Sequence, residues 1–170
     1  KRQVNALMSL LRRYLRTEID RMMHNQVRVI AIGDVARLPS SVRGELESAI
    51  ERTRHNDKLT VGLCVSYGGR EDIVQATRQL ARRVAAGRLA PDDIDETAIS
   101  GALGTASLPD PDLLIRTSGE MRISNFYLWQ LAYTEIFVTE ALWPDFREAE
   151  YVAALAAFQR RERRFGRVLE

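Results

Sequence analysis

Two arginines and a serine stand close together in the segment RTSGEMRIS, which runs from Arg116 to Ser124. Arg116 directly follows an apolar run, and Arg122 stands just before Ser124. Guanidinium groups donate forked hydrogen bonds to phosphate oxygens, and serine hydroxyls add neutral donors. The spacing therefore predicts a diphosphate-binding site. The alternative is that Arg116 pairs with Glu120 or Asp112 while Arg122 is a solvated surface residue.

Glu135 is a carboxylate within AYTEIFV, a segment whose apolar pattern predicts a strand. A carboxylate on an inner strand needs a partner, because burying an unpaired charge is costly. Mg²⁺ commonly takes one or two carboxylates together with phosphate oxygens and waters. Glu135 is therefore a candidate Mg²⁺ ligand close to the diphosphate site. The alternative is an edge-strand glutamate paired with one of the many arginines.

Strand patterns recur along the chain around these residues. Buried strands are predicted for VRVIAI, LTVGLCV, PDLLIR and TEIFVT, and three of them end in the turns GD, SYGGR and RTSGE. Parallel strands need crossover helices, and ligands of such folds lie beyond the carboxyl ends of the strands. The order predicts an α/β fold with a mostly parallel central sheet flanked by helices, its polar turns gathered at one rim.

Helical patterns separate the strands. Gly87 is expected to end the helix that follows SYGG, and Ser124 or Asn125 to cap a short helix whose free N–H groups favour an anion. The predicted helices cover the opening residues to Met22, a stretch beginning near Pro39, residues 70–87, part of 91–103, 124–132 and 147–163.

Composition indicates a folded globular protein and excludes several kinds of site. With 170 residues, 45% of them hydrophobic, we expect a single domain over 1–170. Cys64 is the only cysteine, which excludes an intrachain disulfide and a thiolate metal site. The formal charge of +2 is spread among both signs, so no nucleic-acid partner is expected. No apolar run reaches the roughly 18 residues that a membrane span needs. We expect a cytoplasmic location, with peripheral membrane contact left open.

Several segments together resemble the cis-prenyltransferase family, nearest to its bacterial undecaprenyl diphosphate synthases. The main one is PDLLIRTSGEMRISNFYLWQLAYTEIFVTEALWPDF, residues 111–146. IGD at 32–34, YGGR at 67–70 and RERRFG at 161–166 follow the family's order. The resemblance therefore covers essentially the whole chain.

The resemblance implies roles for the residues already singled out. In this family two arginines and a serine hold isopentenyl diphosphate, and the glutamate, here Glu135, helps bind Mg²⁺. An Arg-x-Gly element near the C-terminus crosses the interface of a homodimer and completes the partner's diphosphate site. The substrate-binding residues so implied are Arg116, Arg122, Ser124, Arg164 and Gly166.

The family's activity is cis-prenyl elongation, in which isopentenyl diphosphate condenses with an allylic prenyl diphosphate to give a Z-polyprenyl diphosphate. Undecaprenyl diphosphate, the precursor of the bacterial cell-wall carrier lipid, is the expected product. Burial of an apolar chain is favourable by about 0.8 kcal/mol per CH₂, which favours a hydrophobic tunnel. Leu7, Leu11 and Leu59 are the candidates for the tunnel wall.

One departure concerns the catalytic residues. Family members carry, before the first helix of this sequence, a loop with an aspartate that binds the allylic diphosphate, and no such loop is present among the 170 residues. The chain is therefore interpreted as the C-terminal portion of a catalytic domain, inactive by itself, with its catalytic residues unknown. The alternatives are a non-catalytic prenyltransferase subunit, a shorter-chain Z-prenyl diphosphate synthase, and a generic phosphate-binding α/β module.

Overall fold

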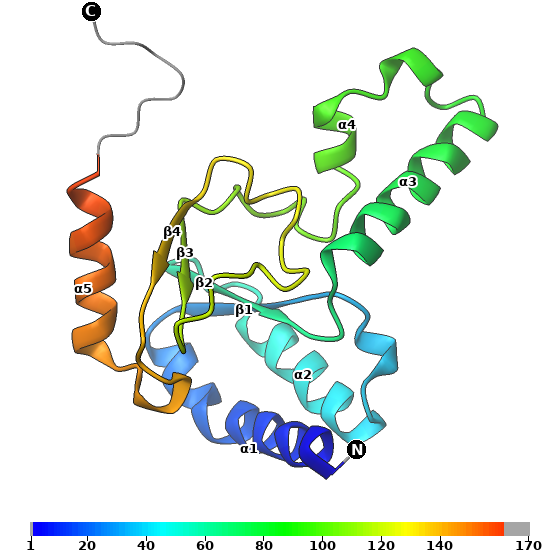
Figure 1. The fold of residues 1–170 in the computed structure, drawn as a ribbon. Helices are drawn as coiled ribbons and strands as arrows, with labels where there is room; N and C mark the ends of the chain where they lie inside the picture. Colours follow the sequence, from blue (N-terminus) through cyan, green and yellow to red (C-terminus); the bar gives the residue numbers. More distant parts are fainter. Residues whose placement is uncertain (1, 162–170) are drawn as a thin grey trace, which may run out of the picture. The chain divides into compact units, whose positions relative to one another are not determined.

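A computed structural model of the protein describes residues 2–161, which form two compact units (Figure 1). The first unit ends at Ser107 and the second begins at Leu108. Every helix in the described part of the chain is too short or too polar to cross a membrane.

The first unit alternates helices with two strands. Its strands β1 and β2 pair in parallel, with Val27 opposite Leu59 and Ile32 opposite Cys64. The bounds of its elements are α1 Arg2–His24, β1 Val27–Ile32, α2 Ser40–Thr53, β2 Leu59–Cys64, α3 Gly69–Ala85 and α4 Glu96–Ser100, with short 3₁₀ turns at Val35–Arg37 and Pro91–Asp93.

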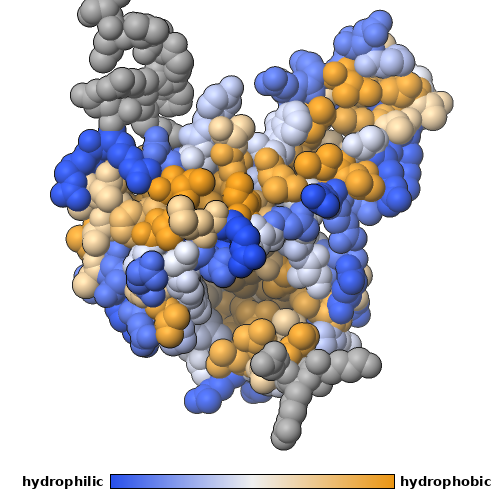
Figure 2. Space-filling view, in the orientation of Figure 1, coloured by the Kyte–Doolittle hydropathy of each residue, from blue (hydrophilic) through white to orange (hydrophobic). Residues whose placement is uncertain are grey.

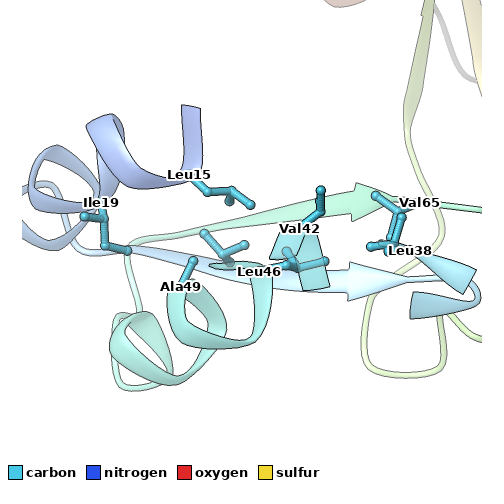
Figure 3. Close-up of a cluster of buried hydrophobic side chains, with 8 residues drawn as sticks. Leu15, Ile19, Leu38, Val42, Leu46, Ala49 and Val65 are labelled. Carbon is cyan, nitrogen blue, oxygen red and sulfur yellow. The ribbon is translucent and has the colours of Figure 1, made fainter. Parts of the chain in front are cut away.

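Packing of α1 and α2 on the strands forms the core of the first unit. Leu15 and Ile19 of α1 and Leu46 of α2 recur at helical spacing and are at most 5% exposed. Figure 3 shows these side chains together with those of Leu38 and Val65 from the segments after β1 and β2. The cluster comprises Leu15, Ile19, Val29, Leu38, Val42, Leu46, Ala49 and Val65.

Two buried polar side chains join the end of α2 to β1. The Thr53 hydroxyl accepts a hydrogen bond from the Val29 N–H at 3.0 Å and donates one to the Ala49 carbonyl at 2.8 Å. The Asn56 amide donates to the Val27 carbonyl at 2.8 Å. Thr53 and Asn56 thereby both have hydrogen-bond partners, as buried polar side chains in a stable core require.

Helix α3 ends where the sequence predicts. Gly87 has a φ of +67°, which glycine adopts without a Cβ penalty. Its N–H donates to the Val84 carbonyl and the Arg88 N–H donates to the Arg83 carbonyl, both at 2.9 Å. These are the bonds of a Schellman-type helix end, and they confirm the predicted stop at Gly87.

The second unit contains β3 Leu113–Arg116, β4 Glu135–Val138, a 3₁₀ turn at Trp143–Asp145 and α5 Glu148–Gln159. Strands β3 and β4 are parallel, with Leu113 opposite Glu135 and Arg116 opposite Val138. The pairing of the backbones continues beyond β3, where the Ser118 N–H donates to the Ala141 carbonyl at 2.9 Å. The turn after β3 is therefore tied to the segment after β4.

The predicted α/β class with parallel strands is confirmed, and each of the four predicted strands is present. The strands form two two-stranded sheets, β1–β2 and β3–β4, one in each unit. That residues 1–170 fold as a single domain stays a prediction.

The helix predicted for 124–132 is wrong. That segment consists of turns, with an N–H to carbonyl bond of 3.1 Å from Leu131 to Tyr127. Ser124, Asn125 and Tyr127 have φ angles of +55°, +63° and +46°, which a right-handed helix cannot contain. The stretch therefore lacks the helix N-terminus that was expected to favour an anion.

The first turn of α5 contains Glu150, a carboxylate whose pKa lies below its ordinary value. The Arg147 N–H donates to Glu150 Oε2 at 2.8 Å, and this bond to the charged carboxylate is the main cause that lowers the pKa of Glu150. A hydrogen bond from the backbone of Glu150 itself and the positive charge of Arg147 lower it further. The cap thus depends on an ionised Glu150.

We predict that the start of α5 loosens when pH falls below the ordinary glutamate range of about 4.3. A depressed carboxyl pKa means that the stabilisation is complete above the unfolded-state pKa and is lost as pH falls through the folded-state pKa. Hydrogen exchange of the Arg147 amide, compared above and below this range, measures the effect. In Glu150→Gln the acid-dependent change should vanish, and an identical change in that variant would contradict the assignment.

Candidate functional site

Arg116 occupies the carboxyl end of β3, the position where ligands of parallel sheets bind. Its side chain is half-buried, and its Nε atom is buried with no hydrogen-bond partner among the described residues. An unsatisfied buried donor costs roughly 1–3 kcal/mol, so such groups are rare without a functional reason. Arg116 is therefore a candidate to bind an acceptor from outside the described residues.

The loop after Arg116 contains a concentration of left-handed backbone. Ser118 and Gly119 have φ angles of +63° and +62°, and Ser124 and Asn125 follow with +55° and +63°. Non-glycine residues in this region cost on the order of 1 kcal/mol each, and such residues cluster at binding sites. The same loop carries Ser124 and its hydroxyl at an exposed position.

Glycine is favoured at position 119, where φ is +62° and a side chain would meet that of Glu140. A Cβ atom built there would lie 2.6 Å from Glu140 Oε2, well inside van der Waals contact. Glu140 follows the next strand and comes to Gly119 only through the pairing of β3 with β4. Sequence gave no signal for this contact.

Arg122 is paired with a neighbouring carboxylate. Its Nε donates to Glu120 Oε2 at 3.1 Å, and its Nη2 donates to Oε1 at 3.1 Å and to Oε2 at 2.9 Å. Arg122 is 79% exposed, and exposed pairs of this kind contribute only about 0–1 kcal/mol. Arg122 could therefore leave Glu120 and bind a diphosphate instead at little cost in free energy. In the alternative interpretation Arg116 pairs with Glu120 or Asp112, and the structure pairs Glu120 with Arg122.

Glu135 begins β4 and lies opposite Leu113, three ladder positions before the level of Arg116. At about 3.3 Å per residue this separates the two backbones by roughly 10 Å along the sheet. Arg161 Nη1 donates to Glu135 Oε2 at 2.6 Å. The arginine pair offered as the alternative for Glu135 is thus present.

The donor set at Glu135 fits Mg²⁺ only in part. No cluster of three or more potential metal-ligating side chains occurs within the described ranges. A single carboxylate suits Mg²⁺ when diphosphate oxygens and waters supply the other ligands, and Arg161 would have to move from the carboxylate. The metal role of Glu135 stays a prediction.

The first unit has a pocket of about 470 Å³ at the carboxyl ends of its own strands. Asp72 closes one side, accepting hydrogen bonds from the Gly104 N–H at 2.8 Å and from the Tyr67 hydroxyl at 3.1 Å. Gly33, with φ +109°, allows the Val65 carbonyl to lie close to its backbone, since a Cβ at Gly33 would be 2.3 Å from that oxygen. The GD and SYGGR turns therefore meet at one rim, as predicted. The RTSGE turn belongs to the second unit, and its place at the same rim stays a prediction.

The three tunnel candidates have different environments. Leu7 and Leu59 are 60% and 57% exposed, whereas Leu11 is half-buried against the core. Figure 2 shows hydrophobic surface at the N-terminal end of α1. Their place in a tunnel wall stays a prediction. Arg164 and Gly166 lie outside the described residues.

Parallel strands with polar turns beyond their carboxyl ends define an α/β ligand-binding protein, and the unsatisfied Arg116 points to an anionic ligand. A family model described as "Putative undecaprenyl diphosphate synthase" matches residues 1–166. The chain belongs to this prenyltransferase family.

Individual relatives agree with the family. The chain is 51% identical over 166 residues to an isoprenyl transferase of Heliobacterium mobile, covering 98% of this chain and 64% of the relative. It is 45% identical to a ditrans,polycis-undecaprenyl-diphosphate synthase, (2E,6E)-farnesyl-diphosphate specific, of Pasteurella multocida, covering 98% of this chain and 69% of the relative. Lavandulyl diphosphate synthase from Lavandula x intermedia, solved in complex with dimethylallyl diphosphate, superposes with a TM-score of 0.95 at 42% identity, covering 98% of this chain and 72% of that one.

The chain thus spans slightly less than two thirds of the length of the Heliobacterium relative. Residues of that relative outside the matched region have no counterpart among the described residues.

Proposed function

We propose that the protein takes part in cis-prenyl elongation, joining isopentenyl diphosphate to an allylic prenyl diphosphate. The observation that carries the proposal is the half-buried Arg116, whose Nε lacks a partner at the carboxyl end of β3. The names of the relatives, isoprenyl transferase and undecaprenyl-diphosphate synthase, describe the same chemistry.

In this proposal Arg116, Arg122 and Ser124 bind the diphosphate of isopentenyl diphosphate. The terminal double-bond carbon of that substrate attacks the allylic carbon of the other. The allylic C–O bond breaks, its electron pair leaves with the diphosphate, and a proton lost from the isopentenyl unit creates a Z double bond. Fixing one substrate beside the other removes entropic cost, and fixed cationic donors stabilise phosphate charge.

We further propose Mg²⁺ as the cofactor, with Glu135 as one ligand. When bound, Mg²⁺ supplies positive charge that stabilises the departing diphosphate. Glu135 would exchange its contact with Arg161 for this role. Arg161 follows α5 and is the last residue that the structure describes.

Further parts of the proposal concern the product and the assembly. Leu7, Leu11 and Leu59 line a tunnel for the growing chain, and undecaprenyl diphosphate is the product. The protein is a cytoplasmic homodimer in which Arg164 and Gly166 reach the partner's diphosphate site. Radiolabelled product sized by chromatography separates an undecaprenyl synthase from a shorter-chain one.

Calorimetric titration tests the ligand class. With MgCl₂ present, we expect residues 1–170 to bind isopentenyl diphosphate saturably and ATP weakly or not at all. Removing Mg²⁺ with EDTA should weaken the binding of isopentenyl diphosphate. Binding of ATP without binding of isopentenyl diphosphate would overturn the proposal in favour of a generic phosphate-binding module.

A further inference from the structure

One ion pair connects the end of α5 to the first residue of β4. Arg161 lies just beyond Arg160, the residue that caps the C-terminal end of α5, and its Nη1 donates to Glu135 Oε2 at 2.6 Å. Helix α5 packs beside β4 in the same unit (Figure 1). The pair is partly shielded from water, because the side chains of Glu135 and Arg161 are only 29% and 39% exposed. The contact therefore joins the end of α5 to the proposed metal ligand.

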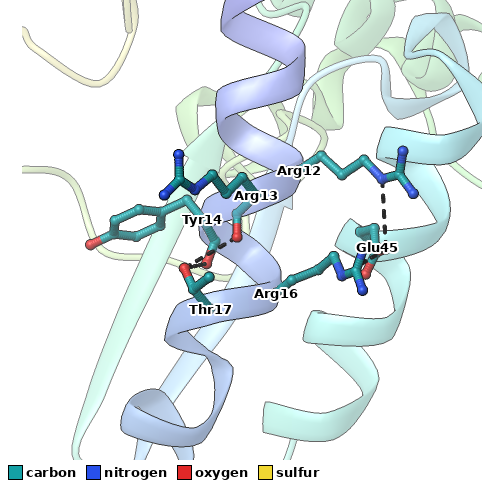
Figure 4. Close-up of polar contacts among 6 residues, drawn as sticks. All are labelled: Arg12, Arg13, Tyr14, Arg16, Thr17 and Glu45. Atoms are coloured by element: carbon teal, nitrogen blue, oxygen red, sulfur yellow. Dashed lines mark hydrogen bonds and ion pairs between the residues drawn. The ribbon is translucent and has the colours of Figure 1, made fainter.

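A pair between α1 and α2 gives a measure of how close this contact is. Arg12 and Arg16 both approach Glu45, with each Nε 3.7 Å from Glu45 Oε1 (Figure 4). That distance is too long for a hydrogen bond. The contact of Arg161 with Glu135 is a charge-assisted hydrogen bond, which is roughly twice as strong as a neutral one. Among the described residues, Arg161 is the one cation that pairs with Glu135.

Mg²⁺ and Arg161 would repel each other strongly if both contacted Glu135. Mg²⁺ lies about 2.0–2.1 Å from its oxygen ligands, so a metal on this carboxylate would be within roughly 6 Å of the guanidinium. Charges of +2 and +1 at that separation repel where water is partly excluded. The backbone of Glu135 is held in the sheet, because its N–H donates to the Asp112 carbonyl at 3.1 Å. Arg161 is therefore the group that leaves when a metal binds.

We propose that Arg161 is a positioning residue for Glu135, which holds the carboxylate in the absence of metal and is displaced when Mg²⁺ binds together with a diphosphate. This inference rests on the proposed metal role of Glu135. Mg²⁺ gives up its waters reluctantly, and a single carboxylate already paired with arginine attracts it weakly. A diphosphate supplies further oxygen ligands, so Mg²⁺ and diphosphate together displace Arg161 more readily than Mg²⁺ alone.

Displacement of Arg161 also loosens the turn that ends α5. The Arg161 N–H donates to the Phe158 carbonyl at 3.1 Å, so the residue that pairs with Glu135 also closes this turn through its backbone. Coupling between two sites is reciprocal: the free energy that Mg²⁺ loses in displacing Arg161 equals the free energy by which metal weakens the contact of Arg161 with Glu135. Hydrogen exchange of the Arg161 amide therefore reports on the metal site.

Titration of residues 1–170 with Mn²⁺, followed by the electron paramagnetic resonance signal of the free ion, tests the competition. Mn²⁺ takes the same kinds of oxygen ligand as Mg²⁺. The test variant is Arg161→Gln. The matched control is Arg160→Gln, which removes the same charge from the preceding exposed residue, an arginine that pairs with no described carboxylate. Arg161→Lys keeps the charge, Glu135→Gln removes the carboxylate, and circular dichroism establishes that each variant is folded.

Without diphosphate we expect Arg161→Gln to bind Mn²⁺ about tenfold more tightly than the wild type, because a charge-assisted hydrogen bond no longer competes with the metal. Arg161→Lys should stay close to the wild type. Arg160→Gln should gain no more than about twofold, because the attraction between exposed charges is screened by water and salt.

Hydrogen exchange gives a second readout that does not depend on activity. In the wild type, addition of MgCl₂ with sodium diphosphate should speed exchange of the Arg161 amide. In Arg161→Gln the amide of residue 161 should exchange rapidly already, and the metal should leave its rate unchanged. An equal response to the metal in both chains would contradict the proposal.

Three results of the Mn²⁺ titration would overturn the proposal: equal affinity in the wild type and Arg161→Gln, weaker affinity in Arg161→Gln, or an equal gain in Arg160→Gln. Weaker affinity would mean that Arg161 orients Glu135 for the metal instead of competing with it. Failure of the metal site itself has a different signature, because Glu135→Gln would then leave Mn²⁺ binding unchanged. Loss of Mn²⁺ binding in Glu135→Gln without a gain in Arg161→Gln would overturn the role of Arg161 alone.

Discussion

Arg116→Met is expected to lower the affinity for isopentenyl diphosphate about a hundredfold, or roughly 2.7 kcal/mol, without lowering the stability of the fold. Methionine keeps much of the length of the arginine side chain but removes the guanidinium. The free energy of unfolding should be unchanged or higher by about 1 kcal/mol, because the substitution also removes a buried donor that has no partner. Calorimetry and urea unfolding measure the two quantities.

This combination of results distinguishes a binding residue from a structural one. Arg116→Lys keeps the charge and loses the forked geometry, so its affinity should fall between those of the wild type and the methionine variant. Arg43→Met on α2, where the arginine lies 3.9 Å from Glu47, serves as the matched control and should bind normally. If Arg116→Met destabilised the protein and left the affinity unchanged, the assignment of Arg116 to the diphosphate would be wrong.

The second large effect is expected in the core of the first unit. Leu46 is 0% exposed and lies among the buried side chains of α1, α2 and β1. Leu46→Ala removes apolar contacts and leaves a cavity, which should lower the free energy of unfolding by about 3–4 kcal/mol. With a urea dependence of about 2 kcal/mol per M, the midpoint should fall by roughly 1.5–2 M. Val74→Ala, at a position that is 46% exposed, should change the urea midpoint little.

The same variant tests whether residues 1–170 fold as one domain. Both tryptophans of the chain, Trp129 and Trp143, belong to the second unit, so their fluorescence reports on that unit. Far-UV circular dichroism is dominated by the long helices of the first unit. A single domain predicts that Leu46→Ala shifts both transitions equally. A shift of the dichroism transition alone would mean that the units unfold independently.

Much of the fold follows from local patterns. Each of the four strands was predicted because its apolar run is bounded by turn residues, and the end of α3 was predicted because only glycine adopts the Gly87 conformation readily. These features depend on residues within a few positions of one another. The local sequence is therefore enough to predict the four strands and the end of α3.

The segment 124–132 shows where this reasoning fails. Its aromatic and apolar spacing is that of a helix, yet Ser124, Asn125 and Tyr127 adopt positive φ. Stacking of the Phe126 and Tyr127 rings, with centroids 4.2 Å apart, accompanies this backbone. Tertiary context overrode a helical propensity that is worth only tenths of a kcal/mol per residue.

The sequence by itself determined which residue types gather after β3, and from their chemistry and spacing it predicts that Arg116, Arg122 and Ser124 bind a diphosphate. Only the tertiary structure decided which of these groups is free and which is paired. Parallel pairing of β3 with β4 brings Glu140 to Gly119, and the chain after α5 brings Arg161 to Glu135. Such contacts join residues about twenty or more positions apart. The free energy that selects one charge partner among many comes from the packing of whole helices and strands. A local sequence pattern does not contain this information.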